Sequence, residues 1–313
     1  MNTPDDEPAA DAALASVAVF SNSYRNVHLA AGATGFRSHG LRYRAPDHVT
    51  PAQIGEEFLA GTRLVRSDRE TEVSVQAYFR PDGVVLLSLA GQEGNEDAID
   101  TMPLPNGVPL RLELGEAIRR RRSSRHFTGD SLGLVELASV VRSAAGVTAR
   151  AKVQVPGDGE ATLAFRAVAS GGGLFPVDLH VVALRIRRLE GGVYRYDPHV
   201  DQLIRTHEPH ELPPLLDSFA IFEDALTLRR AAAIFLLVGH PWRSMRKYGS
   251  RGVRFLFLEA GAIAQNIHLA TMGVGFGSVD CASVYDDEVH DALGIDGRFQ
   301  TLLHTVIVGA PTD

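Results

Sequence analysis

The chain has 313 residues, of which 45% are hydrophobic and 22% are charged. This composition is typical of a globular protein with a sizeable core and argues against a disordered chain. The formal net charge of -7 argues against nucleic acid as the main partner, because proteins that bind a phosphate backbone present a basic face. The single cysteine, Cys281, excludes an intrachain disulfide and a cysteine-rich zinc site.

The beginning of the chain, MNTPDDEPAADAALAS, has acidic residues where a signal peptide needs positive charge. No apolar run approaches the roughly 20 residues that a membrane span requires. The lone cysteine fits a reducing compartment, so we expect a cytoplasmic protein with no membrane partner. Residues 1–17 are rich in Asp, Ala and Pro and predict a flexible tail.

Residues 18–105 are expected to form a small N-terminal α/β region. A Thr-Pro-Ala-Gln pattern that starts at Thr50 combines a capping box with a proline at the first helical position, and it predicts a short helix. Residues 72–91 predict two strands joined by a Pro-Asp-Gly turn. Three prolines and a glycine in residues 101–110 indicate a domain boundary, so the second domain is predicted over 106–313.

The second domain mixes predicted helices and strands without regular alternation, which favours the α+β class. Helices are predicted over 112–121, within 131–147 with a stop at Gly146, and over 251–273. The last helix has a wide apolar face with several small residues, as in a buried or intersubunit helix. Strands are predicted over 178–186, 191–197, 231–239 and 302–311.

Three features that resemble chemical motifs are interpreted as structural. The glycines of GVGFGSV (273–279) follow a predicted helix, so they predict a helix end and a tight turn rather than a dinucleotide site. Pro209 in HEPHE (207–211) blocks the helix that would place two histidines on one face, so no metal site is expected. Cys281 lies in apolar surroundings and is expected to pack.

The sequence AIRRRRSSRHF, residues 117–127, concentrates positive charge within an acidic chain. Guanidinium groups match phosphate oxygens with two parallel hydrogen bonds, and a serine hydroxyl adds a neutral donor. The residues alone leave the anion open between a nucleic acid, an acidic partner, solvent and a single phosphate group.

Five motifs occur in a characteristic order: RRSSRHF, ASGGGLFPVDLHVVA, YRYDP, RKYGSRGVRFLFLEAGAIAQNIHLATMGVGFGSV and YDDEVHDALGIDG. In this order the chain resembles a SagB-type dehydrogenase, the FMN-dependent azoline oxidase branch of the nitroreductase-like superfamily. The resemblance covers about residues 112–311. It implies an α+β fold with a mixed central sheet flanked by helices, a long dimer-interface helix, a homodimer and FMN as the cofactor.

The resemblance also assigns cofactor-binding positions. The flavin phosphate is gripped by Arg122, Ser123 and Arg125 in this assignment, whereas residues 119–121 are interpreted as a solvated helix end. The loop that packs on the isoalloxazine from the partner subunit contains Ala169, Ser170, Gly171 and Gly172. Ala169 stands where the family has proline, and three glycines let the backbone approach a flat ring. Cys281 and Ala282 are placed against flavin N5.

Lys247 and Tyr248 match a Lys-Tyr pair that azoline-oxidising members place on the substrate side of the flavin. Azoline oxidation removes a proton from the ring carbon next to a carbonyl and a hydride from the neighbouring carbon. A desolvated lysine with a lowered pKa, beside the positive charges of Arg246 and Arg251, is suited to take the proton. The tyrosine hydroxyl would relay the proton or orient the ring. Plain nitroreductases do not need this pair.

The resemblance therefore implies oxidation of thiazoline or oxazoline rings to thiazole or oxazole in a ribosomally synthesised precursor peptide, with dioxygen reoxidising the flavin. The alternative is an NAD(P)H-dependent nitroreductase or enone reductase with the same fold and cofactor. A catalytically silent scaffold subunit is a third interpretation, and it predicts a colourless protein. The N-terminal region is expected to help dock a leader peptide or a partner cyclodehydratase by strand addition.

Overall fold

A computed structural model describes residues 55, 58–64, 69–77, 98–155 and 159–312. The chain divides into two compact units, residues 1–64 and 65–313. In the first unit, residues 58–61 are helical, within the helix predicted from the capping box at Thr50. The predicted start of that helix lies outside the described residues. All elements named below belong to the second unit.

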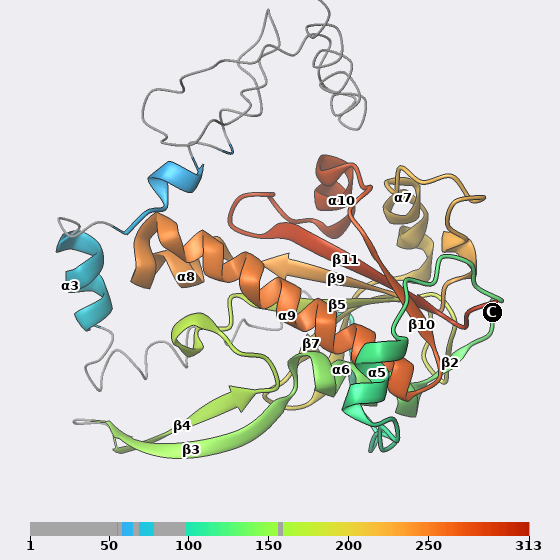
Figure 1. Cartoon of the computed structure of the whole chain (residues 1–313), viewed down its shortest axis with the longest axis horizontal. Coiled ribbons are helices and arrows are strands. Elements are labelled where there is room, and N and C mark those ends of the chain that lie inside the picture. Colours follow the sequence, from blue (N-terminus) through green and yellow to red (C-terminus); the bar gives the residue numbers. More distant parts are fainter. Residues whose placement is uncertain (1–54, 56–57, 65–68, 78–97, 156–158, 313) are drawn as a thin grey trace, which may run out of the picture. The chain divides into compact units, whose positions relative to one another are not determined.

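A seven-stranded sheet forms the centre of the second unit (Figure 1). Each strand is antiparallel to its neighbours. In spatial order the strands are β1 (Asp100–Pro103), β8 (Gln202–His207), β7 (Gly192–Asp197), β5 (Val177–Ala183), β9 (Ala233–Gly239), β11 (Thr301–Gly309) and β10 (Gly277–Cys281). The strands predicted from the sequence correspond to β5, β7, β9 and β11, so the middle of the sheet was predicted correctly.

In the described part of the chain, parallel pairing occurs at two places in addition to this antiparallel arrangement. The short strands β2 (Leu132–Gly133) and β6 (Ile186–Arg187) pair in parallel, and a parallel bridge joins Ser123 to Ser278 of β10. A separate antiparallel hairpin is formed by β3 (Val147–Val155) and β4 (Gly159–Arg166). The expected α+β class, with a mixed sheet flanked by helices, is confirmed.

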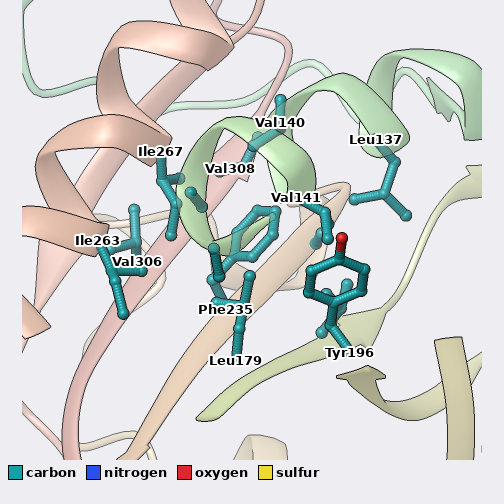
Figure 2. Packing of buried hydrophobic residues seen from close by; sticks show 14 of the residues in the cluster. Leu137, Val140, Val141, Leu179, Tyr196, Phe235, Ile263, Ile267, Val306 and Val308 are labelled. Carbon is teal, nitrogen blue, oxygen red and sulfur yellow. The ribbon is translucent and has the colours of Figure 1, made fainter. Parts of the chain in front are cut away.

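Helices cover both faces of the sheet. They are α5 (Leu114–Arg120), α6 (Leu134–Ala145), α7 (Leu212–Asp217), α8 (Pro241–Tyr248), α9 (Gly252–Gly273) and α10 (Asp286–Leu293). On one face, α6 and α9 bury Val140, Val141 and Ile267 against sheet residues that include Phe235 and Val306 (Figure 2). On the other face, α7 and α10 pack against a second apolar cluster.

Strand β9 shows why the sequence predicts the core so well. All seven of its residues are buried, as expected for a continuous apolar run in a strand covered on both faces.

Long helix α9 ends at Gly273, and Gly275 has φ +80° in the turn that leads into β10. The prediction that GVGFGSV forms a helix end and a turn is therefore confirmed.

The first strand of the hairpin predicted over 72–91 is wrong, because Arg69–Ala77 forms helix α3. The alternating apolar and polar residues do not mark a buried face, since Val73 is 65% exposed. Instead, the Ser74 hydroxyl donates a hydrogen bond to the carbonyl of Arg246 on α8 at 2.7 Å. Tertiary contact thus stabilises a helix where the pattern predicted a strand. The turn and the second strand lie outside the described residues.

Strand β1 pairs with β8, so residues of the predicted boundary segment 101–110 already belong to the main sheet. The functional division into a tail (1–17), a docking region (18–105) and a catalytic domain (106–313) stays a prediction. No helix in the described part of the chain combines the length and hydropathy that are needed to cross a bilayer.

The packing predicts a large cost for truncating Phe235, which is fully buried in β9. Phe235→Ala should lower the free energy of unfolding by about 3–5 kcal/mol, because it removes apolar contacts and leaves a cavity. Urea denaturation measures the change. Val200→Ala is the control, since Val200 is 61% exposed and its truncation should cost less than about 0.5 kcal/mol. Equal effects would contradict this placement of the core.

Candidate functional site

Residues 170–175, called the glycine loop below, make a tight turn between β4 and β5. Gly172 and Gly173 both have φ +67°, a conformation that glycine adopts without steric cost. Phe175 has φ +45°, which is strained for a residue with a side chain. The Phe175 N–H donates to the Ser170 hydroxyl at 2.9 Å, and the Arg166 guanidinium lies 4.6 Å from the centre of the Phe175 ring. These two contacts hold the strained turn.

The predicted catalytic pair meets the glycine loop in space. A Cβ atom added at Gly172 would lie 2.6 Å from Tyr248 Oη and 2.7 Å from Lys247 Nζ. A Cβ atom at Gly171 would lie 3.1 Å from the Phe255 ring, which packs edge-on against Tyr248 with ring centres 4.8 Å apart. A side chain at Gly172 would therefore displace Lys247 Nζ and Tyr248 Oη, and the structure brings together two motifs that lie far apart in the sequence.

Burial sets the acid–base properties of this pair. Lys247 lies in the last turn of α8 and is 4% exposed, with Nζ 5.2 Å from the centre of the Tyr248 ring. Burial lowers the pKa of Lys247, because desolvation disfavours the ammonium form. Burial raises the pKa of Tyr248 for the corresponding reason. Burial is the cause of the lysine shift, whereas the sequence also suggested a contribution from the charges of Arg246 and Arg251. The pair thus combines a proton acceptor with a hydroxyl donor.

A buried network of charges, which sequence reasoning missed, lies around the strand that follows the glycine loop. Asp178 on β5 accepts hydrogen bonds from Arg243 Nη1 at 3.0 Å and is paired with His240 Nε2 at 2.9 Å. Burial raises the pKa of Asp178, but Arg243 and His240 lower it by more, so it lies well below the usual range. Asp178 therefore stays ionised and anchors the start of α8. A single charged residue inside an apolar strand was the available signal.

The arginine-rich segment lies at the edge of the sheet. Arg119 and Arg120 are exposed at the end of α5, which agrees with their interpretation as a solvated helix end. Arg122, Ser123 and Arg125 are exposed as well. Arg122 Nη1 donates to two carbonyl groups at the end of α5, at 2.9 and 2.7 Å. These exposed donors can meet an anion from solvent.

Strand β10 connects this segment to the residues predicted beside flavin N5. Ser123 pairs with Ser278, and the Ser124 N–H donates to the Ser278 carbonyl at 3.0 Å. Cys281 ends the same strand three residues later, which is about 10 Å along β10. The Cys281 side chain is buried in an apolar cluster, and burial raises the pKa of its thiol. Cys281 therefore packs, as predicted, while its neighbour Ala282 is exposed.

A second polar group missed from the sequence bridges β10, β11 and α9. Asp280 Oδ1 lies 2.9 Å from His268 Nε2 and 2.7 Å from His304 Nε2, and His268 Nδ1 lies 2.7 Å from Ser278 Oγ. Burial raises the pKa of Asp280, but the hydrogen bonds with the two histidines lower it by more. This group fixes the strand between Ser278 and Cys281. Within the described residues, no group of three or more His, Cys, Asp or Glu side chains is arranged to hold a metal ion.

The predicted site residues thus form two groups at different ends of α9. The glycine loop, with Lys247 and Tyr248, lies at the beginning of the helix, next to Phe255. The arginine-rich segment lies beside β10, which follows the end of the helix (Figure 1). A helix of 22 residues is about 33 Å long. Within one chain, the two groups are therefore separated by much of the length of α9.

The family described as "Nitroreductase family" matches residues 118–310. The chain belongs to this family. The matched range contains the glycine loop, the Lys247–Tyr248 pair and β10. The nitroreductase family uses FMN, so FMN is the cofactor and the chain is an oxidoreductase of this family.

Relatives described as "putative nitroreductase" occur in several organisms. The protein MJ1384 of Methanocaldococcus jannaschii is 29% identical over 204 residues, which cover 63% of this chain and 91% of that protein. A crystal structure from Ralstonia eutropha has a TM-score of 0.51 at 21% identity and covers 71% of this chain and 93% of that chain. One from Anabaena variabilis has a TM-score of 0.55 at 18% identity, and 43% of that chain is covered. At these identities the structures show the fold.

A further structure of similar fold is the E. coli microcin synthetase McbBCD complex with truncated pro-MccB17 bound. Its TM-score is 0.50 at 19% identity, and the match covers 77% of this chain and 97% of that chain.

The contacts of Gly172 predict different effects of alanine at two neighbouring positions. Gly172→Ala and Gly173→Ala both place alanine at φ +67°, which costs about 1 kcal/mol. Only Gly172→Ala adds a Cβ that displaces Lys247 Nζ and Tyr248 Oη, because nothing lies within 4 Å of the corresponding Cβ at Gly173. Amine acylation of Lys247, followed by peptide mass spectrometry, should therefore be faster in Gly172→Ala than in Gly173→Ala. Identical acylation rates would contradict the contact.

Proposed function

We propose that this chain is an FMN-dependent dehydrogenase that oxidises thiazoline or oxazoline rings to thiazole or oxazole in a ribosomally synthesised precursor peptide. The observation that carries the proposal is the position of Lys247 Nζ and Tyr248 Oη against Gly172 of the glycine loop. Burial lowers the pKa of this lysine. A buried, basic amine next to a backbone that can approach a flat ring is the arrangement that proton removal from an azoline needs.

Azoline oxidation removes a proton and a hydride from adjacent ring carbons. FMN, when bound, supplies the acceptor for the hydride. Lys247 takes the proton from the ring carbon next to the carbonyl, and its low exposure keeps water from competing at Nζ. The Tyr248 hydroxyl, whose pKa is raised by burial, stays protonated and donates a hydrogen bond that orients the ring. Dioxygen is the proposed final electron acceptor.

The residues present fit FMN. Gly173 has a positive φ angle, and nothing lies within 4 Å of its missing Cβ, so the backbone of the glycine loop is open to a flat ring at this position. Arg122, Ser123 and Arg125 are exposed donors suited to the phosphate. Cys281 ends β10 and Ala282 follows it, three and four residues after Ser278, which pairs with Ser123; their backbone would border the flavin. Ala169 and Ser170 begin the loop on the ring side.

The proposed site is shared between two copies of the chain. Proteins of this fold are commonly dimers. One FMN would be held by the arginine-rich segment of one copy and the glycine loop of its partner, because these groups lie at different ends of α9 in a single chain. The solvent side of α9 supports this arrangement, since Phe257 is 51% and Leu258 is 68% exposed. Exposed apolar side chains on a long helix favour association with another chain.

The fold similarity to the microcin synthetase complex supports a peptide substrate. That complex holds truncated pro-MccB17, so a protein of this fold can work in an assembly that handles a precursor peptide. By analogy, we propose a cyclodehydratase partner for this chain. The alternative function is an NAD(P)H-dependent nitroreductase or enone reductase. It is favoured by the descriptions of the relatives and predicts rapid flavin reduction by NADPH with no reaction on azoline peptides.

Cofactor binding predicts a specific role for Arg125. Arg125→Ala should weaken FMN binding about tenfold or more, because a charge-assisted hydrogen bond contributes roughly 1.5–3 kcal/mol. Quenching of flavin fluorescence on titration measures the dissociation constant. Arg119→Ala removes another exposed arginine, at the end of α5, and should leave FMN binding unchanged. Equal affinities of the two variants would contradict the assigned phosphate site.

The proposed catalytic role of Lys247 and Tyr248 predicts loss of turnover without loss of FMN binding. Lys247→Ala and Tyr248→Phe should keep bound FMN but lower azoline oxidation by about 100-fold or more, the range expected for loss of a general acid or base. Turnover of a thiazoline peptide, followed by mass spectrometry, measures this loss. The control is Lys152→Ala, which removes an exposed lysine paired with Glu160. Normal turnover of both site variants would exclude the proposed base.

Substitution of Lys247 should also change how the rate of azoline oxidation depends on pH. The rate of the wild-type protein should rise with pH as Lys247 loses its proton, through a pKa below that of an ordinary lysine. Tyr248→Phe should retain this rise. A wild-type rate that does not respond to pH in that range would count against Lys247 as the base.

A further inference from the structure

Glu259 connects α9 to both ends of the glycine loop. Its side chain is buried, with 2% of the residue exposed. Glu259 Oε1 accepts the N–H of Val177 at 3.3 Å, just beyond the end of the loop. At the beginning of the loop, the Ser170 hydroxyl interacts with the same carboxyl group and also accepts the N–H of Phe175. One buried carboxyl group therefore spans the base of the loop.

The surroundings make ionisation of this carboxyl group costly. Burial raises the pKa of Glu259 to about 7, although the Ser170 hydroxyl, the Arg166 guanidinium and the Val177 N–H lower it in part. Asp178 on β5 raises it further, and Asp178 is itself paired with Arg243 and His240. Glu259 Oε2 is buried and has no hydrogen-bond partner in the described part of the chain, which adds to the cost of burying a charge.

We propose that Glu259 is a positioning residue that fastens the glycine loop to α9 and thereby holds Gly172 against Lys247 and Tyr248. The beginning of the same helix carries Phe255, which packs on Gly171, so the loop is held to α9 at its base and at its turn. Release of the base would let Gly172 move away from Lys247 Nζ. The role of Glu259 in catalysis rests on the proposed function, which places the glycine loop beside the flavin ring.

Proton binding should strengthen this attachment. The closed loop holds the proton of Glu259 more tightly than an open loop does, because opening exposes the carboxyl group to water and returns its pKa toward the ordinary value of 4.5. Stability of the closed loop is then complete below about pH 4.5 and decreases as pH rises toward 7. Above pH 7 both states are ionised and the dependence ends.

Hydrogen exchange of the full-length, FMN-loaded protein tests the attachment of the glycine loop and its pH dependence directly. Exchange of residues 168–178 is measured between pH 5 and pH 8, corrected for the intrinsic exchange rate, and compared with the buried strand β9 as an internal reference. Glu259→Gln is a neutral variant of the same shape. Glu259→Ala removes the contact. Asn266→Ala is the matched control, because Asn266 lies on the same helix and donates one hydrogen bond to the Ser143 carbonyl at 3.0 Å.

The proposal predicts that loop protection in the wild-type protein falls about tenfold or more between pH 5 and pH 7 relative to β9, since one unit of pH corresponds to at most a tenfold change for one proton. Glu259→Gln should be strongly protected at every pH, Glu259→Ala weakly protected at every pH, and Asn266→Ala like wild type. Protection that is independent of pH in the wild type, or that keeps its pH dependence in Glu259→Gln, would overturn the proposal. If Glu259→Ala does not fold, the exchange profiles of the wild-type protein and of Glu259→Gln still test the proposal.

A turnover measurement separates this proposal from the proposed function. Glu259→Gln should oxidise an azoline peptide at a rate within about twofold of wild type at pH 6 and should exceed it at pH 8, where the wild-type loop opens more often. A loop that follows the predicted exchange pattern while all variants turn over equally would overturn the positioning role. Failure of the wild-type protein itself to oxidise azolines would contradict the proposed function, whereas the exchange profiles would still test the attachment of the loop.

Discussion

The length of α9 is the constraint on which the candidate site depends. This helix places the glycine loop, Lys247 and Tyr248 at its beginning, and the chain returns along β10 beside the arginine-rich segment after its end. A single flavin cannot span the roughly 33 Å of a 22-residue helix. Under the proposed function, the residues assigned to the phosphate and those assigned to the ring would therefore act on one flavin only if a second copy of the chain contributed one of the two groups. In the proposed symmetric pair of chains, with α9 between them, two such sites would form.

At the beginning of α9, burial determines the acid–base properties of the side chains. Near the glycine loop, low exposure lowers the pKa of Lys247 and raises those of Tyr248 and Glu259. These shifts all favour the neutral form of the group, because each charge would be poorly solvated. Asp178 is the exception, since Arg243 and His240 compensate its charge. Burial thus favours neutral forms of these three groups, whereas Asp178 on β5 keeps a negative charge that is paired with residues at the start of α8.

The sequence predicts the elements whose pattern reflects burial directly. Strand β9 is a continuous apolar run, and α9 has a wide apolar face, so both could be recognised without tertiary information. The strand predicted over 178–186 ends earlier, because the chain leaves β5 after Ala183 and the N–H groups of the next two residues bond to Ala232. Helix α3 was mistaken for a strand because its alternating pattern lies on an exposed segment.

The candidate functional site was predictable only in part. Its predicted residues came from motifs rather than from burial patterns. The glycine loop and the Lys-Tyr pair came from ordered motifs, and their contact through Gly172 depends on the fold. Glu259 and Asp280 gave weak signals because no local motif surrounds them and their partners come from other elements. Local sequence patterns do not encode such contacts.

The most direct test of a shared site uses mixed dimers. Chains with Arg125→Ala and chains with Lys247→Ala carry different affinity tags, and dimers that contain one of each are purified and assayed with the substrate that the wild-type protein accepts. If each flavin is held by both chains, one of the two sites in a mixed dimer contains no substitution, and about half of the wild-type turnover per dimer should return. Mixed dimers that remain as inactive as either parent would show that each chain builds its site alone, which would contradict the account.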